Sequence, residues 1–223
     1  PSQTMSKPLR RAQTHEQKYF RRQQILAAAQ QHFLDVGYHA FTMANLAKSA
    51  GVVKGTLYLY FKTREEVLLT LYNQSLIRWS DIFIDRLSDG MADLDYVEIL
   101  YKTALEDEIF IPLLSRLEQV IEHNVSIDNL IESKRLFIQR LALMAQATEP
   151  ALALNQAQSS DAMRSLGILL MGATQSDLAP SLAGDAIPPD VLAFVDLFSS
   201  KTMFTTNACR IIAGIRTTEY ETL

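Results

Sequence analysis

The sequence predicts an all-α protein with a small N-terminal domain and a larger C-terminal one. Apolar residues recur at helical spacing along most of the 223 residues, and no segment alternates between apolar and polar for long enough to favour strands. Residues 42–66 have the pattern of two short helices joined at a glycine, followed by an aromatic cluster and the start of a third helix. That layout is typical of a helix-turn-helix.

Residues 1–13 are expected to form a flexible basic tail, and the first helix is expected to begin at Thr14. Thr14 and Gln17 have the spacing of a capping box, and Gly37 is placed to end the helix. The expected buried stripe consists of Ile25, Ala29, Phe33 and Val36.

The second helix is expected to start at Thr42, a good N-cap residue, and to stop at Gly51, which can adopt the left-handed conformation that ends a helix. Its buried face is expected to hold Met43, Leu46, Ala47 and Ala50.

Lys54, Gly55 and Thr56 open the next short helix, at the end that helix-turn-helix motifs direct toward base edges. A glycine early in a helix costs about 1 kcal/mol relative to alanine, which indicates that a partner approaches the backbone closely. The alternative is that Gly55 is a packing compromise in an ordinary helical hairpin.

Leu57 and Phe61 should be buried together, which leaves the hydroxyls of Tyr58 and Tyr60 near the surface. Surface tyrosines beside lysines suit phosphate oxygens.

A further capping box, formed by Thr63 and Glu66, fixes the start of a long helix over residues 64–87. Lys62 and Arg64 flank this helix start, whose free N–H groups favour anions.

Charge is distributed unevenly along the chain. Up to Glu65 there are ten Lys and Arg against three Asp and Glu, a balance of +7, whereas the remainder holds eleven against twenty-two, a balance of −11. A basic head on an acidic body is expected of a nucleic-acid-binding module attached to a non-binding body. The alternative is a disordered basic tail without a partner.

The C-terminal part should contain further helices around a core of its own. Among the core-facing candidates of the helix over 64–87 are Val67, Leu71, Ile82 and Phe83. Residues 150–160 have the composition of a linker, and residues 178–189 that of a loop. The expected helices span residues 94–107, 110–124, 127–147, 161–176 and 191–215.

Several function classes find no support in the sequence. The single cysteine, Cys209, cannot form an intrachain disulfide, and no apolar stretch has the length of a signal peptide or a membrane span. No catalytic, phosphate-binding or metal-binding motif is present, so we expect no enzyme, no cofactor and no metal. The acidic runs at 93–98 and 106–108 fit solvated helix faces better than metal ligands. We expect a cytoplasmic protein without membrane contact.

With the helix before it, the segment Thr42 to Glu66 resembles the DNA-binding domain of the TetR family of transcriptional regulators, above all in the run AGVVKGTLYLYFKTREEV. The resemblance covers about the first third of the chain. It departs from the family pattern at Val53, usually a small hydroxyl residue that caps the recognition helix, and at Leu59, frequently His or Tyr. The resemblance implies DNA contacts by Thr42, Lys54, Gly55, Thr56, Tyr58, Tyr60, Lys62 and Arg64.

The same resemblance implies a homodimer in which the last two long helices pack against their copies as a four-helix bundle. Its dyad would then match a pseudo-palindromic operator in double-stranded DNA. An intrachain core is the alternative for any one of these side chains. The candidate dimer residues are Gly167, Gly172, Phe194, Leu197, Phe198, Phe204 and Ile211.

Family members usually hold a small-molecule effector among the central helices of the body. Charged residues are sparse from 141 to 173, which favours a mostly apolar effector. Ordinary caps and core packing are the alternatives for each candidate. The candidate effector residues are Trp79, His123, Asn124, Met144, Met163 and Met171.

The sequence thus predicts a tail over 1–13, a helix-turn-helix DNA-binding domain over 14–63, and an effector-binding and dimerisation domain over 64–223. A dimeric repressor released by its effector is the favoured interpretation. The alternative is an interaction protein of the same fold that has lost operator binding, since Val53 and Leu59 remove polar contacts.

Overall fold

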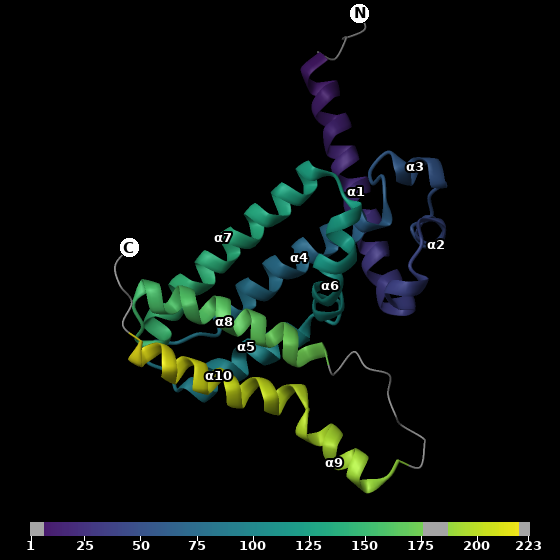
Figure 1. Ribbon diagram of the computed structural model, residues 1–223. Coiled ribbons are helices and arrows are strands. Elements are labelled where there is room, and N and C mark those ends of the chain that lie inside the picture. The colour runs from purple at the N-terminus through teal and green to yellow at the C-terminus, as the bar shows by residue number, and fades with distance from the viewer. Residues whose placement is uncertain (1–6, 176–186, 219–223) are drawn as a thin grey trace, which may run out of the picture. The chain divides into compact units, whose positions relative to one another are not determined.

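The computed structural model describes residues 7–175 and 187–218, and within these ranges every regular element is a helix (Figure 1). The all-α prediction is therefore confirmed. The chain divides into two compact units, residues 1–71 and 72–223. The border falls inside one long helix, α4 (Arg64–Asp85), whereas the sequence placed it at the start of that helix.

The first unit contains α1 (Lys7–Ala40), α2 (Met43–Ser49), α3 (Lys54–Tyr58) and the first two turns of α4. Because α1 begins at Lys7, the helix start expected at Thr14 is wrong, and most of the expected tail is helical. The physical reason is that residues 7–13 are mostly good helix formers, so the helix continues past Thr14 without needing a cap there. Residues 1–6 lie outside the described ranges.

Gly37 breaks the regular geometry of α1, with φ 67° and ψ −177°. The expected end of the first helix is therefore confirmed at this glycine, after which one more turn leads into α2. Ile25, Ala29 and Phe33 are buried as predicted. Val36 is exposed, contrary to prediction, beside the break at Gly37.

The second unit continues α4 and adds α5 (Asp93–Glu106), α6 (Phe110–Arg116), α7 (Ile127–Leu152), α8 (Gln156–Thr174), α9 (Pro189–Leu197) and α10 (Ser200–Thr217). After α6 the chain forms a π-helical turn, η1 (Leu117–Ile121), and a 3₁₀ turn, η2 (Glu122–Asn124). The single helix expected over 110–124 is thus three elements. The last helix, expected to be continuous, is interrupted at Phe198 and Ser199.

The linker expected over residues 150–160 is wrong, because α7 continues through Pro150 to Leu152 and α8 starts at Gln156. Burial of Ala151 and Leu152 supports the last turn of α7, which ends at Ala153 in the left-handed conformation. Asn155 then caps α8 in a reciprocal capping box with Gln158. A tight turn therefore replaces the linker.

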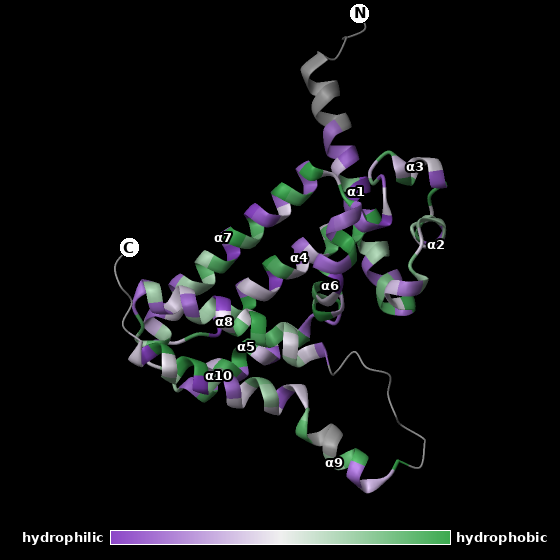
Figure 2. Ribbon diagram, in the orientation of Figure 1, coloured by the Kyte–Doolittle hydropathy of each residue, from purple (hydrophilic) through white to green (hydrophobic). Residues whose placement is uncertain are grey.

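Helix α8 contacts both α7 and α10, and α10 also contacts α5. Figure 2 shows hydrophobic and hydrophilic residues interspersed along α7 and α8, as expected of helices with one buried face. Within this core, the Tyr96 hydroxyl lies 2.7 Å from Thr148 Oγ1, and the Phe83 ring meets the Tyr96 ring edge-on at 5.5 Å. Val67, Leu71 and Phe83 are buried as predicted, whereas Ile82 lies on the outer face of α4 and is exposed.

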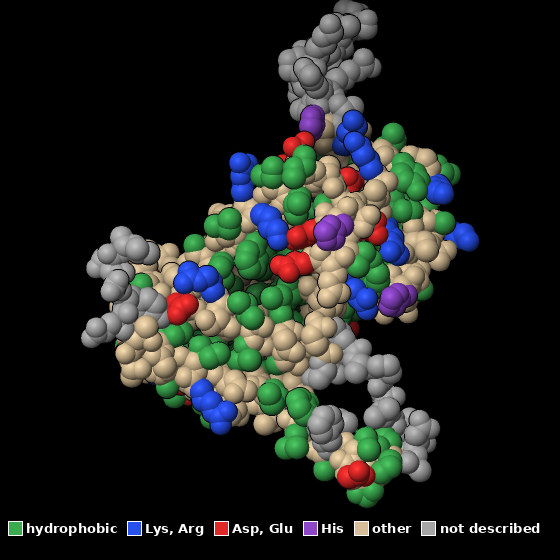
Figure 3. All heavy atoms as spheres, viewed as in Figure 1, with side chains coloured by type: hydrophobic (Ala, Val, Ile, Leu, Met, Phe, Trp, Pro, Cys, Tyr) green, Lys and Arg blue, Asp and Glu red, His purple; other side chains and the backbone are tan. Residues whose placement is uncertain are grey.

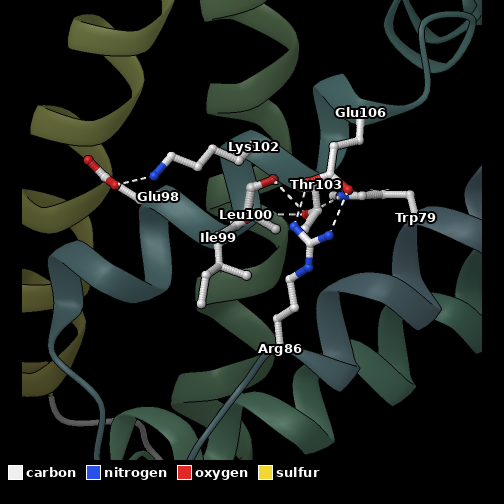
Figure 4. Close-up of polar contacts among 8 residues, drawn as sticks. All are labelled: Trp79, Arg86, Glu98, Ile99, Leu100, Lys102, Thr103 and Glu106. Carbon is white, nitrogen blue, oxygen red and sulfur yellow. Dashed lines mark hydrogen bonds and ion pairs between the residues drawn. The ribbon is translucent and has the colours of Figure 1, made fainter.

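Polar side chains between α4 and α5 find partners within the unit (Figure 4). Trp79 Nε1 donates to Thr103 Oγ1 at 3.1 Å, and Arg86 pairs with Glu106. Lys102 pairs with Glu98 at 2.6 Å in the same view. Two of the acidic residues weighed as metal ligands thus form ion pairs.

Asp93 and Asp107 also face cations, pairing with Arg216 and Arg78 at 2.6 Å each.

Within the described ranges, no helix is long and apolar enough to cross a membrane.

Candidate nucleic-acid interface and ligand cavity

The turn between α2 and α3 is built by local interactions. Thr42 caps α2 by accepting a hydrogen bond from Asn45 N at 3.2 Å, as predicted. Gly51 has φ 64°, in the left-handed region, and Val52 N donates to Ala47 O at 3.0 Å. This geometry redirects the chain so that α3 follows α2 after a short turn.

Helix α3 buries a single side chain, Leu57, which together with Phe61 joins the core as predicted. Lys54 and Tyr58 are exposed, and Lys54 Nζ lies 5.8 Å from the centre of the Tyr58 ring. With its apolar anchor inside, α3 presents most of its surface outward.

Gly55 is not required by the fold. A methyl group placed on its α-carbon would meet no other atom within 4 Å, and its backbone is not in the left-handed region. The alternative of a packing compromise is therefore wrong. The space beside Gly55 is open to a partner outside the chain.

Two large apolar side chains flank this surface. Val53 is 74% exposed and Leu59 is 82% exposed. Val53 occupies the N-cap position of α3 and provides no side-chain hydrogen bond, which confirms the missing cap expected from the sequence.

The start of α4 has the predicted cap. Glu66 N donates to Thr63 Oγ1 at 3.1 Å, and the Glu66 carboxylate accepts from Lys62 N at 2.7 Å. The Lys62 side chain is exposed, and that of Tyr60 is half-buried.

Arg64 makes contacts within the first unit that the sequence did not predict. Its guanidinium donates to Glu65 Oε1 at 2.6 Å, to Phe41 O at 3.2 Å and to the Tyr38 hydroxyl at 3.1 Å. It also lies 4.8 Å from the centre of the Tyr38 ring, and the hydrogen bond to Glu65 raises the pKa of Arg64. Since these contacts join the start of α4 to the end of α1, Arg64 serves the fold of the first unit, and its predicted phosphate contact stays a prediction.

The sequence analysis did not name Lys48 as a candidate DNA contact, although it is an exposed cation in the last turn of α2. Its position one residue before Ser49, at the end of the helix, was the available signal. In Figure 3, Lys and Arg side chains are spread over the elements α1 to α3.

The second unit contains an apolar cavity of about 350 Å³ formed by α4 to α8 and η1. Figure 3 shows a hollow lined by hydrophobic side chains between α7 and α8, with acidic side chains at its edge. Four of the predicted effector residues line the cavity. They are Trp79, Met144, Met163 and Met171.

His123 and Asn124 do not line this cavity, so the structure does not bring them together with the other four candidate effector residues. Both are exposed in η2, and Asn124 Nδ2 donates to Val120 O at 2.8 Å. The helix expected over 110–124 would have carried them along its face, but the π-helical turn changes the direction of the chain before them.

A second compartment of about 220 Å³ adjoins the apolar cavity and shares Tyr72, Leu114, Glu118, Phe137 and Met171 with it. Its remaining wall is mostly polar. It consists of Ser115, Leu117, Gln119, Glu122, Ser133, Lys134 and Gln175. The two compartments together form a cavity with one apolar and one polar end.

The candidate dimer residues fall into different environments. Phe204 is fully buried against Tyr101 within the chain, with ring centres 5.6 Å apart, so its assignment to an interface is corrected to the intrachain core. Gly167 borders the apolar cavity and Ile211 is half-buried. Gly172, Leu197 and Phe198 are exposed. The side chain of Phe194 lies outside the described residues.

Ile168, which the sequence analysis did not name as a dimer candidate, is 68% exposed on α8 between Arg164 and Gly172, and it lines the open side of the apolar cavity together with Arg164. A helical spacing of four residues links these positions, a signal that the sequence contained.

Comparisons with known proteins agree with this geometry. A family model described as bacterial regulatory proteins of the tetR family matches residues 25–71, and one described as a tetracyclin repressor-like C-terminal domain matches residues 73–218. A fatty acid metabolism regulator protein from Bacillus subtilis (strain 168) is 35% identical over 78 residues, which are 35% of this chain and 38% of that protein. The transcriptional activator FasR from Mycolicibacterium smegmatis is 45% identical over 51 residues, 23% of each chain.

Among solved structures, a TetR transcriptional regulator from Rhodococcus sp. RHA1 superposes with a TM-score of 0.58 at 16% identity, covering 92% of this chain and all of the other. At this identity the likeness concerns the fold alone.

A helix-turn-helix unit followed by a helical body with a cavity defines a DNA-binding transcriptional regulator, a class without enzymatic activity. The chain belongs to the TetR family of bacterial regulators.

Proposed function

We propose that the protein is a homodimeric repressor that occupies a pseudo-palindromic operator and leaves it when a small, mostly apolar effector fills the cavity. The main support comes from one helix. Its first turn is capped beside the exposed Lys62, and Tyr72, Leu76 and Trp79 further along it line the cavity. The same continuous helix thus carries residues of both sites.

For DNA recognition, Lys54, Gly55 and Thr56 approach base edges, with Tyr58 nearby. Lysine donates to guanine in the major groove, and the open space at Gly55 allows close backbone approach. Thr42, Tyr60 and Lys62 contact phosphates, and we add Lys48 to this group because it is exposed at the end of α2.

The exposed Val53 and Leu59 suit the methyl group of thymine, which apolar side chains contact in the major groove. Their apolar character therefore fits a different base preference as well as it fits a lost DNA contact. Replacing operator thymines by uracil, which lacks the methyl group, should weaken binding at the positions that these side chains read.

For dimerisation, Ile168 and Gly172 on α8 give an outward face with one apolar and one very small residue. Small residues permit the close approach of helices from two subunits. The two recognition helices would then lie about 34–36 Å apart, one turn of the duplex, or a multiple of it.

For effector response, an occupant of the cavity would press on Trp79 and Leu76 and shift α4, which changes the spacing of the two recognition helices. Repression is the simpler outcome of such release. The relative FasR is named an activator, so the sign of regulation is part of the test. We place the protein in the cytoplasm, where its DNA would be.

The deciding experiment is selection of bound sequences from a random duplex library at about 150 mM salt, a concentration that suppresses non-specific phosphate binding. A palindromic consensus supports the dimeric reader. A reporter driven by a promoter containing that consensus should then be silenced by the protein, whereas increased expression would identify an activator.

The second candidate function is that of an interaction protein that has lost its operator, which the two exposed apolar side chains that flank α3, Val53 and Leu59, favour. Folded, dimeric protein that enriches no sequence in the selection would support it. Binding to a protein partner would then show little of the steep salt dependence that DNA binding has.

A further inference from the structure

The hydroxyl group of Tyr72 is buried without a partner. The side chain is 1% exposed, and its oxygen has no hydrogen bond in the structure. Buried polar groups are nearly always paired, and leaving one unpaired destabilises a fold. Tyr72 is among the residues that line both compartments of the cavity.

The charges nearest this hydroxyl are negative. Burial and the carboxylates of Glu122 and Glu118 all raise the pKa of Tyr72, so the phenol stays neutral. Lys134 Nζ lies 2.7 Å from Glu122 Oε1, and these two charges offset one another. Among the described residues, Glu118 has no cation within ion-pair distance and lines both compartments.

The backbone that carries Glu118 is unusual. η1 is a π-helical turn between α6 and a 3₁₀ turn, and such wide turns occur frequently at functional sites. Leu117 and Ile121 of this turn are buried. The exposed Glu118 therefore borders the cavity from a segment fixed by its buried neighbours.

The apolar compartment adds little charge. Arg164 is the single cation among the described residues that line it, and its guanidinium lies 3.4 Å from Asp161 Oδ1. The rest of the lining beyond Glu118 is apolar or aromatic, and the Trp79 and Phe110 rings lie tilted against one another with their centres 4.7 Å apart. A ligand would thus meet an apolar wall at one end and an unpaired carboxylate with a free hydroxyl at the other.

We propose that the effector is an amphipathic organic cation, with an ammonium head between Tyr72 and Glu118 and an apolar body in the compartment lined by Trp79 and Met163. An ammonium group can donate to both the tyrosine oxygen and the carboxylate. This inference rests on the proposed effector role of the cavity and names the chemical class of its occupant.

A carboxylate head is the opposite case. It would approach Glu118 and Glu122, and its available cation, Lys134, is already paired with Glu122. A neutral alcohol could use the Tyr72 hydroxyl but would gain nothing from Glu118. The three head groups should therefore bind in the order ammonium, alcohol, carboxylate.

The test is titration calorimetry on the full chain at neutral pH with n-decylamine, n-decanol and decanoic acid, each below its aggregation concentration. The amine should bind about tenfold more tightly than the acid, which corresponds to one net charge-assisted hydrogen bond. Glu118→Gln should abolish most of this preference, whereas Glu132→Gln, an exposed carboxylate on α7 outside the cavity lining, should leave it unchanged.

Two further variants locate the binding. Tyr72→Phe should weaken the amine and the alcohol severalfold. Met171→Trp, which fills the shared wall of the compartments, should block all three probes in protein whose thermal unfolding shows that it remains folded.

The outcomes of these measurements distinguish the proposal of a cationic effector from the proposal that the cavity is an effector site. Tighter binding of decanoic acid than of the amine, or an amine preference that survives Glu118→Gln, overturns the cationic effector and leaves the cavity as an effector site. Binding that persists in Met171→Trp overturns the assignment to this cavity. If none of the probes binds, both the cationic effector and the effector role of the cavity fall, while DNA selection tests operator binding separately.

Discussion

Polar side chains in two stretches of α4, at its start and about two turns further on, have opposite environments. In the first unit, the Arg64 guanidinium donates to a carboxylate, a carbonyl and a hydroxyl of its own unit. About two turns later, in the second unit, the buried Tyr72 hydroxyl has no partner. The comparison teaches that one helix can have its hydrogen-bonding groups satisfied within the chain in one stretch and leave a buried hydroxyl unsatisfied in the next, and the proposed ligand site lies beside the unsatisfied one.

The same contrast holds for the surfaces of the two units. The first unit closes its core and presents cations such as Lys54 and Lys62 outward, toward a large polyanion. The second unit keeps its candidate site in a cavity, which Glu118 and Tyr72 both line. One unit is suited to a macromolecule and the other to a small molecule.

The largest expected effect is on the stability of the fold, at Arg64, whose hydrogen bonds are satisfied within the first unit. Arg64→Ala should lower the free energy of unfolding by about 3 kcal/mol, because it leaves Glu65 and the Phe41 carbonyl without their charged donor. Urea denaturation measures the change. Arg210→Ala, which removes an exposed cation on α10, should change stability by less than about 0.5 kcal/mol. Unchanged stability with lost DNA affinity in Arg64→Ala would instead return Arg64 to the phosphate contacts.

Next come the outward cations of the first unit. Lys54→Ala should weaken operator binding by about 2 kcal/mol and relax the preference at one base position. Lys62→Ala should weaken binding on all sequences alike and reduce the salt slope by about 1.

Binding titrations on the consensus and on single-base variants, at several salt concentrations, distinguish these roles. Lys102→Ala, in the second unit, is the matched control and should leave DNA affinity unaltered. Equal losses of specificity from Lys54→Ala and Lys62→Ala would show that the roles are assigned wrongly.

A smaller change in stability is expected at Tyr72, whose buried hydroxyl has no partner. Tyr72→Phe should raise the free energy of unfolding by about 1 kcal/mol, since it removes a buried hydroxyl without a partner. Tyr96→Phe is the matched control: it breaks the hydrogen bond to Thr148 and should lower stability by about 1 kcal/mol. Destabilisation by both changes would mean that the Tyr72 hydroxyl is paired in solution.

The smallest expected change is at Gly55. Gly55→Ala should raise stability by up to about 1 kcal/mol, because alanine favours the helix and meets no atom of the chain. The same methyl group should lower operator affinity about fivefold by holding the backbone away from DNA. Thermal unfolding and DNA titration of one variant give both values, and unchanged affinity would remove Gly55 from the interface.

Most of the first unit could be predicted from sequence because its structure is local. Thr42, Gly51 and the Thr63–Glu66 pair act over three or four residues, and each has the predicted geometry. Arg64 was the exception. Its partner Phe41 lies 23 positions away, and no local pattern contains such a contact.

The second unit was less predictable because its features depend on distant packing. Four cavity residues were identified from their chemistry, but His123 and Asn124 were lost when a π-helical turn replaced regular helix. Proline predicted a break at Pro150, whereas the buried side chains that follow it stabilise another helical turn. The apolar pattern around Phe204 is the same whether the side chain packs in the core of one chain or at an interface between two, so the sequence could not distinguish the two cases.

Tyr72, Leu76 and Trp79 lie on one face of α4, spaced by four and three residues, and all three line the apolar cavity. Arg64, Glu65 and Glu66 lie more than a turn earlier and take no part in it. Substitutions on the cavity face can therefore accumulate without altering the residues that anchor the DNA-reading unit. Under the proposed function, a lineage or an engineer could therefore change the effector while keeping the operator, and the cavity face of α4 is the place to begin.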